Sequence, residues 1–172
     1  MTPLQMSAMG FVLILLDPIF FGYDAVPDWA GWALVLAGSW KLRPMIGARF
    51  ATLFSAGVVA AVISVATFVP AIAGSLSPSA GWFVSLPQLL FMCLLCLSVA
   101  DAARLTEPSE PATSRRFRRL VWALALVGVL PVLVLPAQVA GLALVTAAVA
   151  VGVFIFFVYA LFRVSKRDYV LP

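Results

Sequence analysis

The hydrophobic positions of the chain form long blocks separated by short polar connections, a pattern typical of helices that cross a membrane. A spanning helix needs about 20 mostly apolar residues, with a range of roughly 17–25. Cutting the chain at charged residues and at Pro/Gly clusters leaves six candidate helices, at residues 4–21, 29–42, 50–69, 82–103, 120–135 and 139–162. The third, fourth and sixth reach spanning length, the second and fifth are short, and Asp17-Pro18 interrupts the first.

The basic residues predict how these helices are oriented. Lys41 lies at the end of the second helix, and the other ten Lys and Arg residues lie between the second and third helices, between the fourth and fifth, or after the sixth. The other three connections contain none. Because Lys and Arg accumulate in cytoplasmic loops, we expect an all-α, polytopic integral membrane protein whose six transmembrane helices form three hairpins with both termini in the cytoplasm. Residues 1–172 then form a single transmembrane domain.

A second topology stays open for the first two helices. They could form a re-entrant hairpin that only dips into the bilayer, which leaves four crossings and the same distribution of basic residues. In that arrangement Asp24 and Asp28, at the tip of the hairpin, would be charges left in hydrocarbon. The cost of such charges favours full crossing.

The composition excludes several classes of protein. The chain is 64% hydrophobic and 10% charged, and its mean hydropathy is +1.12. A soluble domain of this length has too little interior for so many apolar residues, and disorder needs far lower hydrophobicity. The net charge of +4 is small and offers no broad basic face for nucleic acid. We therefore expect the lipid bilayer as the solvent and no nucleic acid as a partner.

Aromatic residues at the ends of the predicted helices agree with this placement. Trp and Tyr prefer the membrane interfaces, where the ring lies in apolar surroundings and one polar atom stays wet. Four of them fall at predicted outer helix ends and four at predicted inner ends: Tyr23, Trp29, Trp32 and Trp82 outside, and Trp40, Trp122, Tyr159 and Tyr169 inside.

The residue types available in the chain exclude several catalytic mechanisms. The chain has no histidine, so no Ser-His or Cys-His nucleophile and no His-ligated metal or haem can be assembled. Cys93 and Cys96 share one helix face, but a redox pair needs access to water and surroundings that favour the thiolate. We interpret them as packing thiols, and we expect no enzyme activity, no cofactor and no metal.

Three acidic residues form the most informative polar cluster. Asp17, Asp24 and Asp28 all lie in or beside the first outer turn, where they are a candidate cation, proton or substrate site. The alternatives are structural. Asp28 precedes a helix and can cap it, and Asp17 precedes a proline, which disfavours continuation of the first helix.

Two prolines fall inside predicted helices, Pro87 in the fourth and Pro131 in the fifth. Each frees a backbone carbonyl, and such breaks can line a binding cavity in a membrane protein. The alternative is a simple kink.

The one extended polar stretch, at residues 104–119, predicts a flexible cytoplasmic loop. It ends in a basic cluster that we interpret as either an anionic-lipid contact or a topology anchor. The cluster consists of Arg115, Arg116, Arg118 and Arg119.

Small residues form ridges on the third and sixth helices. The first ridge is Ala56, Ala60 and Ser64, and the second is Ala140, Ala148 and Gly152. Small residues let helices approach closely in lipid. The ridges therefore predict packing within the bundle or a face for a homo-oligomer or partner.

The first hairpin also resembles a family of small bacterial multi-pass membrane proteins. Its pattern is a first helix ending in Asp, a short turn, and Pro-Asp-x-x-Gly-aromatic opening the second helix, matched here by Asp17, Pro27, Asp28, Gly31 and Trp32. The match covers about the first quarter of the chain. The resemblance implies bacterial origin and residence in the inner membrane, and it implies no mechanism.

These observations predict a small bacterial inner-membrane helix bundle with a non-enzymatic role, either structural or in binding a membrane-protein partner. The alternative is a small transporter or a substrate-capturing membrane subunit that uses Asp17 near the outer mouth.

Overall fold

Almost all of the chain that the structure describes is helical, which confirms the all-α fold class. The computed structural model describes residues 1–16, 19–20, 23–24, 28–69, 72, 74–106, 109–134 and 140–166. Its helices are α1 (Pro3–Leu16), α2 (Asp28–Lys41), α3 (Arg43–Ile46), the 3-10 helix η1 (Gly47–Arg49), α4 (Phe50–Thr67), α6 (Pro78–Leu105), α7 (Pro111–Val134) and α8 (Ala140–Val164). The two-residue strands β1 (Ile19–Phe20) and β2 (Tyr23–Asp24) pair antiparallel between α1 and α2.

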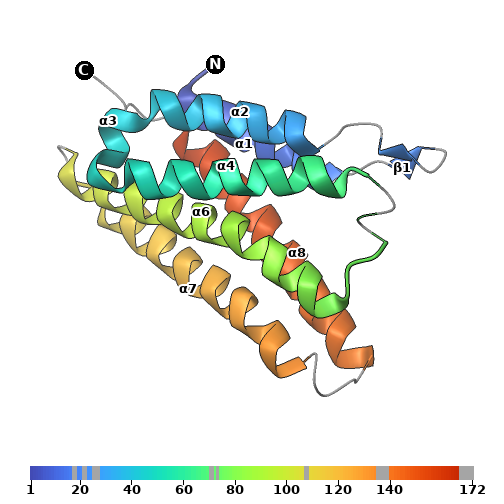
Figure 1. The fold of residues 1–172 in the computed structure, drawn as a ribbon. Coiled ribbons are helices and arrows are strands. Elements are labelled where there is room, and N and C mark those ends of the chain that lie inside the picture. The colour runs from blue at the N-terminus through green and yellow to red at the C-terminus, as the bar shows by residue number, and fades with distance from the viewer. Residues whose placement is uncertain are drawn as a thin grey trace.

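The long helices are arranged as a closed ring (Figure 1). In the order α1, α2, α4, α6, α7 and α8, each helix packs on the next, and α8 packs back on α1. Successive helices run in opposite directions, so the start of α1 and the end of α8 lie at the same end of the ring. We call this the basic end, because Lys41, Arg43, Arg49, Arg104 and Arg163 lie at the helix termini there.

Glycines bring α1 and α2 unusually close. A Cβ atom added to Gly31 of α2 would lie 2.6 Å from the carbonyl oxygen of Gly10 on α1. A Cβ added to Gly38, two turns further along, would lie 2.7 Å from the carbonyl oxygen of Pro3. Only a residue without a Cβ fits at such distances, and close backbone approach is how helices associate in lipid.

The core of the ring is an aromatic cluster centred on Phe11. Its ring lies 5.9 Å from that of Trp32, 5.9 Å from that of Phe91 and 5.1 Å from that of Phe157, measured between centroids. Trp32 is only 1% exposed. Edge-to-face contacts with Phe11 and Phe91 hold its ring inside the bundle.

The lengths of the helices support a multi-pass membrane protein. Among the described residues, four helical segments are long and apolar enough to cross a bilayer, at Arg43–Thr67, Pro78–Leu105, Pro111–Val134 and Gly141–Val164. α1 and α2 have 14 residues each, or about 21 Å at 1.5 Å per residue. The hydrocarbon layer is about 30 Å thick, so these two helices form a shorter hairpin within the ring.

Several helix boundaries differ from those predicted from the sequence. α6 begins at Pro78 rather than at Trp82, because the side chain of Ser77 accepts a hydrogen bond from the backbone N–H of Ala80 and caps the helix. The predicted loop at residues 104–119 is mostly helix, since α6 continues to Leu105 and α7 begins at Pro111. Proline suits the first position of a helix. Burial of Phe117 and Leu120 on one face of α7 stabilises the helical turns that replace the predicted loop.

Candidate functional site

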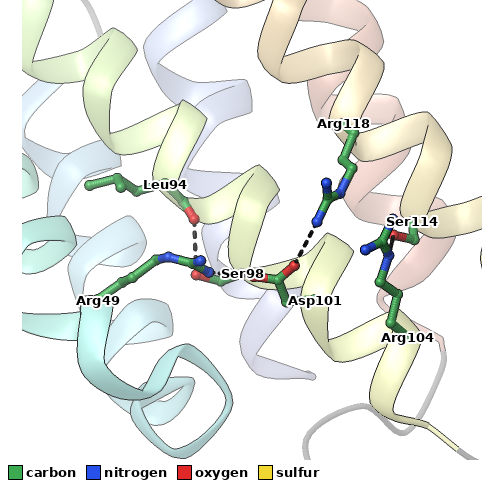
Figure 2. A network of polar contacts seen from close by, with 7 residues as sticks. All are labelled: Arg49, Leu94, Ser98, Asp101, Arg104, Ser114 and Arg118. Carbon is green, nitrogen blue, oxygen red and sulfur yellow. Dashed lines mark hydrogen bonds and ion pairs between the residues drawn. The ribbon is translucent and has the colours of Figure 1, made fainter.

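Asp101 is the centre of a polar network at the basic end (Figure 2). Its carboxylate accepts a hydrogen bond of 2.6 Å from Arg49 in η1 and one of 3.4 Å from Arg118 on α7. One turn along α6, the side chain of Arg104 donates to the Ser114 hydroxyl on α7 at 2.9 Å. The network ties three elements together. Since the ion-paired side chains are 34–46% exposed, its contribution to stability is modest.

The basic cluster at the end of the predicted loop lies on the first three turns of α7. Arg115, Arg118 and Arg119 are exposed, and Arg118 is the residue that pairs with Asp101. Arg116 is half-buried and, with Arg163 and Glu110, lines a hollow of about 330 Å³ between the ends of α7 and α8. Contact of these arginines with anionic lipid stays a prediction.

Of the acidic cluster, only Asp28 has a described side chain. Asp17 lies outside the described residues, and Asp24 is placed by its backbone, which pairs with Ile19. Asp28 is half-buried and is the first residue of α2, so its carboxylate lies at the positive end of the helix dipole. In the part of the chain that the structure describes, no group of three or more Cys, Asp or Glu side chains is placed to hold a metal ion.

Away from the basic end, a cavity of about 390 Å³ lies between α6, α7 and α8. Pro78 and Val134 line it where α6 begins and α7 ends, and Met92 and Leu124, both buried, line its deep end with Phe154. The deep end adjoins the aromatic core, because Phe154 packs edge-on against Phe11. The cavity has the size of a typical small-molecule pocket, which is about 300–1,000 Å³.

The two helix-interior prolines lie in different walls. Pro131 lines the cavity between α6, α7 and α8, whereas Pro87 lines a separate, more open groove of about 600 Å³ between α4, α6 and α7. Pro131 cannot donate to the carbonyl of Val127 four residues earlier. At the next carbonyl, that of Gly128, the indole N–H of Trp82 donates a hydrogen bond of 2.8 Å.

Three further polar side chains line the cavity, and their hydrogen bonding differs. The hydroxyl of Ser85 donates to the carbonyl of Trp82 at 2.7 Å, and that of Thr146 donates to the carbonyl of Leu142 at 2.8 Å. Gln88, which lies on the same face of α6 as Ser85, makes no side-chain hydrogen bond within the described part of the chain. We did not single out Gln88 from the sequence. The available signal was an uncharged amide ten residues inside a long apolar helix.

The cysteines and the small-residue ridges lie as follows. Cys96 is fully buried in the core and Cys93 is half-buried, which suits packing thiols. Ala56 and Ala60 are buried against neighbouring helices. Ala148 and Gly152 are exposed on α8, so these two residues of the second ridge do not pack within the bundle, and the side chain of Ala140 lies outside the described part of the chain.

The arrangement at the two ends is therefore different in kind. The basic end is closed by a polar network, and the other end holds an apolar cavity with few hydrogen-bonding groups.

Comparison with protein families, with curated proteins and with solved structures finds no match for this chain.

Proposed function

We propose that the chain is a bacterial inner-membrane protein that crosses the bilayer six times, with both termini in the cytoplasm, and that it captures a lipid-soluble small molecule. The orientation is supported by the helix termini, since basic residues gather at the end of the ring that holds both the start of α1 and the end of α8. Positive charge of this kind marks the cytoplasmic side. Bacterial origin is supported by the resemblance of the first hairpin.

The packing of α2 supports full crossing by the first hairpin. Leu36 of α2 lies against Gly57, near the middle of α4. Asp28 begins the same helix eight residues earlier, which is about 12 Å further from the basic end. Half of the hydrocarbon layer is about 15 Å thick, so Asp28 reaches the region of the outer boundary. A hairpin that only dipped into the bilayer would leave this carboxylate deep in hydrocarbon.

The cavity between α6, α7 and α8 carries the proposed role. A volume of about 390 Å³ among membrane helices, with an apolar lining and a few hydrogen-bonding groups, is typical of a ligand site rather than of a packed core. The sequence has no histidine, and binding without chemistry fits the residues that line the cavity. The role is therefore that of a substrate-capturing membrane protein, with the site on α6, α7 and α8.

A second candidate is a protein partner, and the surface of α8 favours it. The first half of this helix is exposed, with Leu144 74% exposed and Val145 58% exposed. A Cβ added to Gly152 would meet nothing within 4 Å. A second membrane helix, including one from another copy of the chain, could pack there closely.

Native mass spectrometry of the protein from mild detergent tests both roles. A monomer that retains a small molecule at one per chain is the expected result. Stoichiometric retention of another protein favours the second candidate instead. A monomer with no adduct, even after lipophilic compounds are added before purification, contradicts capture.

Labelling of single cysteines tests the orientation, in a background with Cys93→Ser and Cys96→Ser. A membrane-impermeant maleimide added outside the cell should label Ser75→Cys, between α4 and α6, and Asp24→Cys, between α1 and α2. The matched variant Ser109→Cys, between α6 and α7, should react only after the membrane is opened. Protection of Asp24→Cys with normal labelling of Ser75→Cys would establish the four-crossing topology.

A further inference from the structure

Gln88 is a half-buried amide side chain in the wall of a mostly apolar cavity. It lies ten residues after Pro78 along α6, about 15 Å from the start of a helix about 42 Å long, so it falls inside the hydrocarbon layer of about 30 Å that such a helix would cross. The described residues offer it no hydrogen-bond partner. An amide transferred to apolar surroundings without a partner loses free energy, so its presence at this depth calls for an explanation.

The neighbouring polar groups show that this is specific to Gln88. Ser85, Thr146 and Trp82 line the same cavity, and each donates its hydrogen to a backbone carbonyl of the protein. The amide of Gln88 keeps two N–H donors and one carbonyl acceptor available. The oxygens of Ser85 and Thr146 keep lone pairs that can accept a hydrogen bond. Hydrogen-bond donors and acceptors therefore line the cavity on both α6 and α8.

The rest of the lining limits the chemistry of a ligand. Among the described residues, no Asp, Glu, Lys or Arg lines the cavity, so a charged group would enter without a counter-charge, which is costly in hydrocarbon. Beyond Gln88, the deep end is formed by Met92, Leu124 and Phe154, which offer only apolar contact. A ligand that fits is uncharged, has an apolar body for the deep end, and has a hydrogen-bonding group for the amide.

We infer that Gln88 anchors a neutral lipid-soluble molecule that carries a carbonyl or hydroxyl group, by hydrogen bonds from and to its amide. This assignment rests on the proposed function and names the ligand class and the specificity residue of the same site. A carbonyl ligand accepts from the amide N–H, and a hydroxyl ligand donates to the amide oxygen or to the oxygen of Ser85. A hydrocarbon chain of a phospholipid fills the same space without using Gln88.

Photolabelling of the full chain in lipid nanodiscs tests the assignment. The probe is 4-hexylbenzophenone, a neutral ketone that inserts into nearby C–H bonds on irradiation, and Met92 in the deep end is the reporter. We expect labelling of the Met92 peptide to saturate with probe concentration. Gln88→Leu should raise the half-saturating concentration about tenfold, the value of a hydrogen bond of about 1.4 kcal/mol.

Two further variants make the result specific. Thr52→Val removes a polar group from the separate groove between α4, α6 and α7 and should leave the saturation curve unchanged. Ala147→Phe fills the cavity from α8 while leaving Gln88 in place, and it should abolish saturable labelling.

The outcomes separate the assignment from the proposed function. Saturable labelling that is blocked by Ala147→Phe but unaffected by Gln88→Leu overturns the role of Gln88 and leaves capture in the cavity standing. Labelling that rises linearly with probe and is equal in all variants overturns both. A phospholipid that co-purifies at one per chain and is not displaced by the probe overturns the neutral-carbonyl class in favour of an acyl chain.

Discussion

The indole N–H of Trp82 on α6 donates a hydrogen bond of 2.8 Å to the carbonyl oxygen of Gly128 on α7. This bond links two walls of the cavity three residues before the proline that interrupts α7. Helix-breaking prolines are tolerated in membrane helices where neighbouring groups satisfy the disturbed backbone. Trp82 therefore holds α6 and α7 in register where the α7 backbone is weakest.

Replacing Trp82 by phenylalanine should destabilise the bundle. Trp82→Phe keeps an aromatic ring but removes the donor, and we expect a loss of about 1 kcal/mol in the free energy of unfolding. Thermal unfolding in detergent, followed by loss of the monomer peak in size-exclusion chromatography, measures the change. Trp122→Phe is the matched control, because Trp122 is 76% exposed and its replacement should change little.

A double-variant cycle identifies the cause. Pro131→Ala restores a backbone N–H that can donate to the carbonyl of Val127, so the backbone of α7 should depend less on the neighbouring indole bond to Gly128. The free-energy cost of Trp82→Phe should therefore be smaller in that background than in the wild type. Equal costs in both backgrounds would show that the indole bond has no connection with the proline.

The close contact of α1 and α2 should tolerate no added carbon. Gly31→Ala places a methyl group 2.6 Å from the Gly10 carbonyl oxygen, so the helices must separate, and we expect destabilisation by about 1–3 kcal/mol. Gly152→Ala is the matched control, since a Cβ there meets nothing within 4 Å. The same thermal assay compares them, and equal unfolding temperatures for the two variants would contradict the close approach.

The sequence predicts the glycines of this contact only in part. Gly31 belongs to the signature of the first hairpin, but its partner Gly10 shows no pattern until the two helices are placed together. The ridges of small residues illustrate the same limit, because Ala60 faces the core and Ala148 faces outward. Hydrophobic blocks predict which segments are helices. They do not predict which face of a uniformly apolar helix meets a neighbour, because lipid and protein interior are equally apolar.

The cavity could not be predicted from the sequence, for a related reason. Its walls come from α6, α7 and α8, and their separation away from the basic end depends on how three helices pack. The sequence did point to Pro131, which lines the cavity. Gln88 gives a weaker signal in the sequence, because an uncharged amide in an apolar helix is neither a charge, a cysteine nor a proline.

The network around Asp101 should matter less than its charges suggest. Asp101→Asn removes the ion pairs with Arg49 and Arg118, but these side chains are 34–46% exposed. We expect a loss of no more than about 1 kcal/mol in low salt. In about 1 M salt the difference between wild type and variant should nearly vanish, because the screening length falls to about 3 Å. A loss that is large and independent of salt would show that the pairs are effectively buried.

Replacing Gln88 should stabilise the ligand-free protein. If the amide were part of the structure, its loss would weaken the fold. An amide without a partner in apolar surroundings is instead a cost to the fold, and Gln88→Leu, of similar length and apolar, removes that cost. We expect the free energy of unfolding to rise by about 1–3 kcal/mol, seen as a higher unfolding temperature in detergent. Thr52→Val, at an exposed hydroxyl, should give no comparable rise. A lower unfolding temperature for Gln88→Leu would mean that the amide supports the fold, whereas a rise combined with weaker probe binding is the pattern of a residue kept for its ligand at the expense of stability.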